Sequence, residues 1–149
     1  MSNEAAPAHH ANVIVAGLDS SERASGVRDT AIDLAVARHA KLVLVRAIGV
    51  PTEMIPEQRA LLMTNLPDLL HKGAEADLER YAQAVPDVLT LELSVRVGVA
   101  WEAICEEAKA RDASLIVVGA HEYGVVDRIL GTTAAKVVNH APCSTLVVR

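Results

Sequence analysis

The chain has 149 residues, about the length of one domain. Hydrophobic residues make up 51% of it, aromatic residues only 2%, and Phe is absent, so we expect a core of Val, Leu, Ile and Ala of the kind found in strands covered on both faces by helices. The net charge of −5, without any cluster of Lys and Arg, argues against nucleic acid as a partner. No apolar run approaches the roughly 20 residues of a membrane span, which argues against a membrane partner as well.

The N-terminal segment is expected to be a tail. Residues 1–11 are mostly small or polar and show no basic stretch followed by an apolar one, so we expect a flexible tail rather than a secretory signal. One domain should then cover residues 12–149. The expected location is the cytoplasm.

Five short apolar runs predict strands. Four are blocks of Val, Leu and Ile typical of strands buried on both faces, and the third, 91–97, alternates apolar with polar residues as a strand near a sheet edge does. In chain order the runs are 13–18, 42–48, 91–97, 115–120 and 145–149.

Segments of helical period separate these runs. The first covers 21–40, with Ser20 and Ser21 as candidate caps. The segment 56–84 is interrupted by Pro67, which predicts a short helix or loop followed by a helix. Further helices are expected over 100–112 and from about Thr132 to the Ala-Pro pair at 141–142.

Alternation of strands and helices predicts an α/β fold. We expect one doubly wound, five-stranded parallel sheet with helices on both faces and right-handed crossovers. In such sheets the ligand lies beyond the carboxyl ends of the strands. This rule directs attention to 17-GLDSS-21 and to 119-GAHEYGVVDRILGTT-133.

The first half of the second stretch does not match the sequence motifs of known phosphate-binding loops. Gly119 and Gly124 have P-loop spacing, but Val125 and Val126 stand where Lys and Ser or Thr are required. No G-x-G-x-x-G occurs either. The end of the stretch, Gly131 followed by Thr132 and Thr133, could hold an anion at a helix N-terminus, or a threonine could merely cap that helix.

Two further groups of side chains are relevant to ligand binding, metal binding or redox chemistry. Asp19 follows the first strand and either caps the next helix or provides a carboxylate to a ribose hydroxyl or a divalent ion. Cys105 and Cys143 have no metal or redox spacing and are expected to be small core residues. No catalytic residues are predicted, because no histidine has a partner in a recognisable spacing.

These features together resemble the universal stress protein family. The resemblance is carried by 13-VIVAGLDSSERA-24, 98-GVAWEAI-104, 115-LIVVGAH-121 and 131-GTTAAKVVNHAPCSTLVVR-149, and it is weakest across 50–88. The family implies a five-stranded parallel sheet and, in many members, dimers formed through the last strand, here about Thr145–Arg149.

Many members of the family bind ATP with a divalent ion. The resemblance therefore implies ATP, or AMP or ADP, with Mg²⁺ or Mn²⁺, and Asp19 as the one candidate for the metal. The family's motif is Gly, two residues, Gly, nine residues, Gly and then Ser or Thr. Carried over by position, the implied nucleotide-binding residues are Gly17, Asp19, Ala47, Val118, Gly119, Gly131, Thr132 and Thr133.

This sequence departs from the motif at one glycine. Glu122 stands at the second glycine position, and eight residues rather than nine then precede Gly131. Two hypotheses follow. In the first, the chain is a dimeric stress-response protein that binds an adenine nucleotide as a regulatory ligand, with at most slow hydrolysis. In the second, the site is vestigial and the protein acts through protein contacts, for which residues 50–70 are a candidate surface unless they pack on their own domain.

Overall fold

The structure is a computed structural model of the chain. It describes residues 10–49, 55–65, 67–120 and 130–149. The strands are β1 (Ala11–Leu18), β2 (Lys41–Ile48), β3 (Leu91–Val97), β4 (Ala113–Gly119) and β5 (Ser144–Val148). The helices are α1 (Ala24–Arg38), α2 (Pro56–Asn65), α3 (Pro67–Ala82), α4 (Ala100–Ala110) and α5 (Thr132–His140).

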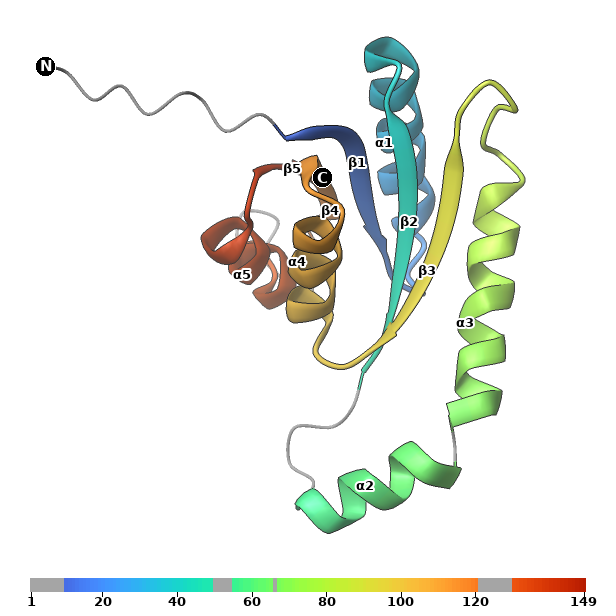
Figure 1. Cartoon of the computed structure of the whole chain (residues 1–149), viewed down its shortest axis with the longest axis vertical. Coiled ribbons are helices and arrows are strands. Elements are labelled where there is room, and N and C mark those ends of the chain that lie inside the picture. Colours follow the sequence, from blue (N-terminus) through green and yellow to red (C-terminus); the bar gives the residue numbers. More distant parts are fainter. Residues whose placement is uncertain (1–9, 50–54, 66, 121–129) are drawn as a thin grey trace, which may run out of the picture.

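The five strands form one parallel sheet in the order β3-β2-β1-β4-β5 (Figure 1). The strand order reverses at β1, from which the chain winds first toward β3 and then toward β5. The predicted doubly wound α/β fold is therefore confirmed, and the strand boundaries differ from those predicted by at most two residues at either end.

Helices cover the two faces of the sheet and divide the core in two. On one face α1 and α3 pack over Ile14, Leu42 and Leu44, and on the other α4 and α5 pack over Val15 and Val43. All five of these strand side chains are fully buried. β-Branched and leucine side chains on both sides of the central strands thus explain the continuous apolar runs in the sequence.

The third strand is an edge strand, as its alternating pattern predicted. Its Glu92, Ser94 and Arg96 lie toward α4, where the only buried charged residue of the described chain, Glu107, accepts hydrogen bonds from Ser94, Arg96 and Arg111. Polar side chains at alternate positions of β3 are therefore used in a network that ties the edge of the sheet to α4.

The segment between β2 and β3 contains two helices separated near Pro67. Figure 1 shows α2 projecting beyond the carboxyl end of β2, and its main neighbour is α3. Large apolar side chains of this arm are exposed, namely Ile55, Leu61, Leu69 and Leu70. The side chains of Leu62 and Met63 lie outside the described residues.

The two serines predicted to cap α1 do not do so. The helix begins at Ala24, its N-cap is Arg23, and no side chain caps it. The hydroxyl of Ser21 instead donates to the carboxylate of Asp19. The prediction was wrong because the helix begins only three residues after Ser21, and the Ser21 side chain is used to close the loop onto Asp19.

Candidate functional site

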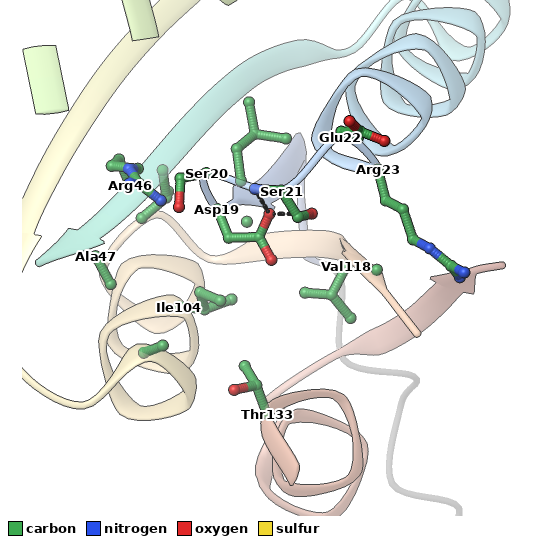
Figure 2. A pocket seen from close by; sticks show the side chains of 15 residues that line it. Asp19, Ser20, Ser21, Glu22, Arg23, Arg46, Ala47, Ile104, Val118 and Thr133 are labelled. Carbon is green, nitrogen blue, oxygen red and sulfur yellow. Dashed lines mark hydrogen bonds between the residues drawn. The ribbon is translucent and has the colours of Figure 1, made fainter. Parts of the chain in front are cut away.

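A cavity of about 700 Å³ opens at the carboxyl ends of the strands (Figure 2). It lies beside the switch point of the strand order, where α/β sheets bind ligands. Its walls come from the β1–α1 loop, the ends of β2 and β4, and the first turns of α4 and α5. The lining residues are Gly17, Leu18, Asp19, Ser20, Ser21, Glu22, Arg23, Val45, Arg46, Ala47, Ala100, Ile104, Val118, Gly119 and Thr133.

Asp19 is held by its own loop and also faces the cavity. One of its carboxylate oxygens accepts from the backbone N–H of Ser21 at 2.8 Å and from the Ser21 hydroxyl at 2.6 Å. Figure 2 shows the other oxygen pointing into the cavity, toward Ile104 and Val118. The expectation that Asp19 caps the next helix is wrong, because the N-cap of α1 is Arg23 and no side chain caps that helix. One oxygen of Asp19 instead organises the loop, and the other is placed to meet a ligand.

Gly17 lies beneath the cavity and lets α4 approach β1. A Cβ built on Gly17 would stand 2.6 Å from Cδ1 of Ile104 and 3.3 Å from Cγ1 of Val118. Such distances are far shorter than ordinary carbon contacts of about 3.5–4.0 Å. A side chain at this position would therefore force Ile104 to shift, and glycine lets Ile104 pack closely against β1 at the floor of the cavity.

The remaining floor is apolar. Val45, Ala47, Ile104 and Val118 contribute it, and Val45, Ile104 and Val118 are buried. An apolar floor at the ends of β2 and β4 can pack against an aromatic ring system. The positions that the family resemblance assigned to the base, Ala47 and Val118, lie on this floor.

Of the three residues Gly131, Thr132 and Thr133, it is Thr133 that contributes to the lining of the cavity. Thr133 lines the cavity, whereas Gly131 is buried as the N-cap of α5 and its N–H donates to the carbonyl of Ala120 at 2.9 Å. Thr132 is exposed and is not part of the lining. No threonine side chain caps α5, so the capping alternative for these residues is wrong, and Thr133 is the residue of this group that can meet an anion.

Six of the eight expected residues thus come together around one cavity, and Gly131 and Thr132 stand beside it. Sequence reasoning missed two cations of the lining, Arg23 and Arg46. Arg23 precedes α1, and Arg46 is the one charged residue within the predicted run 42–48, which was the signal that could have singled it out. His121, Glu122 and Gly124, on which the departure from the motif depends, lie outside the described residues.

The described residues contain no group of three His, Cys, Asp or Glu side chains able to hold a metal ion. Asp19 is a single carboxylate, and a divalent ion coordinated only by Asp19 would need further oxygen ligands from a bound polyphosphate and water. A metal ion at Asp19 would therefore have to receive most of its oxygen ligands from a bound molecule and water. Among these same residues no helix is long and apolar enough to cross a membrane.

The clearest shifts in pKa lie outside this cavity. Burial alone would raise the pKa of Glu107, but hydrogen bonds from Arg111, Arg96 and Ser94 outweigh it and hold the pKa below its ordinary value. Burial raises the pKa of the Cys143 thiol to about 11, with a contribution from the nearby Cys105 and Asp112. Both cysteines are free and half-buried, as expected of core thiols.

Comparison with known proteins agrees with the fold. Residues 11–149 match the universal stress protein family. A curated relative, universal stress protein A homolog 1 of Coxiella burnetii, is 30% identical over 142 residues, covering 93% of this chain and 96% of the relative. The chain therefore belongs to the universal stress protein family.

Solved structures give the same result. Universal stress protein UspA from Lactobacillus plantarum superposes with a TM-score of 0.78 at 26% identity, over 95% of this chain and 99% of that one. A universal stress protein solved in complex with cAMP has a TM-score of 0.60 at 24% identity, over 92% and 96% of the two chains. The first supports the family assignment, and the second shows the shared fold.

Proposed function

We propose that this universal stress protein binds an adenine nucleotide, ATP or a close relative, in the cavity at the carboxyl ends of β1, β2 and β4. The observation that best supports the proposal is that Asp19 and Thr133 line the same cavity on opposite sides of an apolar floor. In Figure 2, Ile104 and Val118 lie between these two polar side chains. The volume of about 700 Å³ is in the range of cavities that enclose nucleotide-sized ligands.

Each part of the ligand has a matching surface in this proposal. The base stacks on Ala47, Val118 and Ile104, and the inward oxygen of Asp19 accepts from a ribose hydroxyl or contacts a divalent ion bound to phosphate. Thr133 donates to phosphate from its hydroxyl at the first turn of α5, where the helix dipole favours negative charge. Mg²⁺ or Mn²⁺ would neutralise part of the negative charge of the polyphosphate.

The ligand is proposed to be regulatory rather than a substrate for rapid turnover. The cavity is lined by one aspartate, one glutamate and two arginines, but by no histidine among the described residues. A base positioned to activate water is therefore not identified, and any hydrolysis of ATP is expected to be slow.

A matched pair of threonine variants tests the binding proposal. Thr133→Val removes the cavity-lining hydroxyl and keeps the shape of the side chain, whereas Thr132→Val makes the same change one residue away, outside the lining. Isothermal titration with ATP and Mg²⁺ should show a loss of roughly 10-fold or more in affinity for Thr133→Val, because a hydrogen bond to a charged group is lost. Equal affinities for the two variants would contradict the assigned phosphate position. ADP, AMP and cAMP complete the ligand panel.

A homodimer formed through β5 is part of the proposal. β5 is an edge strand, and Leu146 on it and Val138 on the adjoining helix are both large apolar side chains with substantial exposure. Pairing with the β5 of a second copy would satisfy the edge and cover these side chains. Sedimentation equilibrium of the wild type against Leu146→Lys tests it, and a wild-type monomer at micromolar concentrations would contradict it.

A cytoplasmic location completes the proposal. Both cysteines are free, as is usual for proteins of a reducing compartment, and ATP is abundant there. Cell fractionation with an antibody against the native protein tests this part separately.

A second candidate function is action through protein contacts without a nucleotide. The observation that favours it is the arm formed by α2 and the start of α3, which exposes Leu61 (64%) and Leu69 (78%). In a strain that lacks the endogenous gene, survival of stress would then be restored by Thr133→Val but not by Leu61→Ser with Leu69→Ser. The nucleotide hypothesis predicts the reverse.

A further inference from the structure

Arg46 is a cation close to the carboxyl end of β2, separated from Lys41 at the start of the strand by four apolar residues. In the sheet it pairs with Leu18 of β1 and Val95 of β3. Its side chain is only 18% exposed, yet it contributes to the lining of the cavity. A guanidinium in this position loses much of its hydration, so its hydrogen-bonding partners matter.

The hydrogen bonds of Arg46 are incomplete within the described part of the protein. Its Nε is buried and has no partner there, and its nearest carboxylate, Asp77 of α3, is 3.8 Å from Nη2. That distance allows electrostatic attraction but is too long for a hydrogen bond. Asp77 instead accepts from Arg80 at 3.0 Å. Asp77 therefore offsets part of the charge of Arg46 without satisfying the Nε–H.

A buried donor without a partner is unfavourable unless an acceptor reaches it. One oxygen of the neighbouring Asp19 is already engaged, since it accepts twice from Ser21. Arg46 also contributes to the lining of the cavity. An acceptor on a bound ligand is thus the group that would complete the hydrogen bonding of Nε.

The position of Arg46 decides which part of the ligand supplies the acceptor. β2 and α5 belong to opposite halves of the sheet, because β1 and β4 lie between β2 and β5 in the strand order. In Figure 2, Arg46 lies beside Ala47 and Ser20 at one end of the cavity, and Thr133 lies at the other, with Asp19 between them. A nucleotide whose phosphates meet Thr133 therefore presents its nucleoside half to Arg46.

We propose that Arg46 is a specificity-determining residue, which donates from Nε to an acceptor on the nucleoside half of the ligand, a ring nitrogen of the base or a ribose oxygen. This inference rests on the proposed nucleotide function. It assigns to an arginine, usually expected on phosphate, a role at the opposite end of the ligand.

Titration of a graded ligand series tests the assignment. Adenosine, AMP and ATP with Mg²⁺ are titrated into the wild type and Arg46→Met, which keeps much of the apolar stem and removes every donor. Because the contact is to the nucleoside, all three ligands should lose affinity by a similar factor, roughly 10-fold to 100-fold. 2′-Deoxyadenosine and free adenine then separate a ribose acceptor from a base acceptor.

Two further variants serve as controls. Arg80→Met removes the other arginine near Asp77, is 67% exposed and lies outside the lining, so it should bind all three ligands as the wild type does. Arg46→Lys keeps the charge but places no donor at the position of Nε, and it should lose nearly as much affinity as Arg46→Met. This conservative variant keeps the test usable if Arg46→Met does not fold.

The results that overturn the proposal are distinct from those that overturn the function. Wild-type affinities in Arg46→Met and Arg46→Lys, or losses that grow steadily from adenosine to ATP, would contradict the nucleoside contact while leaving nucleotide binding intact. If the wild type binds no ligand of the series, the proposed function fails and this assignment fails with it.

Discussion

Ser21 donates twice to a single oxygen of Asp19, from its backbone N–H at 2.8 Å and from its hydroxyl at 2.6 Å. This arrangement closes the loop after β1 and fixes the direction of the second carboxylate oxygen, which points into the cavity. The loop and the site are thus organised by the same side chain, and changes to Asp19 should separate the two roles.

Asp19→Asn should weaken nucleotide binding with little effect on stability. The amide oxygen can still accept from Ser21, but the negative charge available to a ribose hydroxyl or a metal is lost. We expect at least a roughly 10-fold loss of affinity for ATP with Mg²⁺, since a hydrogen bond to a charged group is removed. Asp19→Ala should additionally lower the free energy of unfolding by about 1 kcal/mol, because the loop loses its acceptor.

Calorimetric titration and urea unfolding of both variants provide the check. An Asn variant that binds as tightly as the wild type would show that the inward oxygen is not used. An Ala variant of wild-type stability would show that the Ser21 contacts do not hold the loop.

Gly17→Ala should be destabilising because of its closeness to α4. The added methyl would stand 2.6 Å from Cδ1 of Ile104, a buried side chain, so α4 or Ile104 must move. We expect a loss of about 1–3 kcal/mol in the free energy of unfolding, as for other overpacked cores.

The double variant with Ile104→Val, which lacks the Cδ1 atom, is the matched test of this account. The double variant should recover part of the loss, so that the two changes are not additive in urea unfolding. Additive effects would mean that the strain of Gly17→Ala arises elsewhere.

The fold was predictable from the sequence because strands buried on both faces leave unbroken apolar runs. The runs at 13–18 and 42–48 became β1 and β2 almost residue for residue, and the alternation at 91–97 correctly placed β3 at an edge. The carboxyl-end rule then located the cavity.

Side-chain hydrogen bonding was less predictable. The spacing of Ser20 and Ser21 before a helical segment suggested caps, but the choice of Asp19 as the partner of Ser21 depends on the three-dimensional course of the loop. Arg46 was missed for a similar reason, since the sequence does not show whether a lone cation in a strand reaches a cavity or solvent. Likewise, Gly131 could not be distinguished from Thr133 until the N–H of Gly131 was seen bonded to Ala120.

Glu107 should stabilise the protein at neutral pH. It is 3% exposed and accepts hydrogen bonds from Ser94, Arg96 and Arg111, the first at 3.0 Å. Glu107→Gln removes the charge that pairs with two arginines, and a loss of about 1–3 kcal/mol is expected, moderated because both arginines are partly exposed. The matched control is Glu106→Gln, an exposed neighbour 3.7 Å from Arg96, which should cost less than about 0.5 kcal/mol.

The same residue predicts a pH dependence with a definite sign. Because the pKa of Glu107 is lower in the folded protein than its ordinary value of 4.5, its contribution is complete above about pH 4.5 and is lost as the pH falls through the folded pKa. Urea midpoints measured between pH 7 and pH 3 should fall more steeply for the wild type than for Glu107→Gln. Parallel curves would contradict the assigned role of the carboxylate.

Cys143 should react slowly with alkylating reagents. Since burial raises the pKa of its thiol to about 11, only about one molecule in a thousand carries the thiolate at pH 8. In a Cys105→Ser background, which leaves Cys143 as the single thiol, iodoacetamide should modify the folded protein at least about 10-fold more slowly than the protein in urea. Equal rates would show that Cys143 is accessible and has an ordinary pKa.

The central claim is that the cavity bounded by Asp19, Ala47 and Thr133 binds an adenine nucleotide. Its most direct test is the melting temperature of the wild-type protein, freed of bound ligand, with and without ATP and Mg²⁺. At a ligand concentration of about 100 times the dissociation constant, binding contributes about 2.7 kcal/mol and should raise the melting temperature by roughly 5–10 °C. An unchanged melting temperature with millimolar ATP, and equally with ADP, AMP and cAMP, would contradict it.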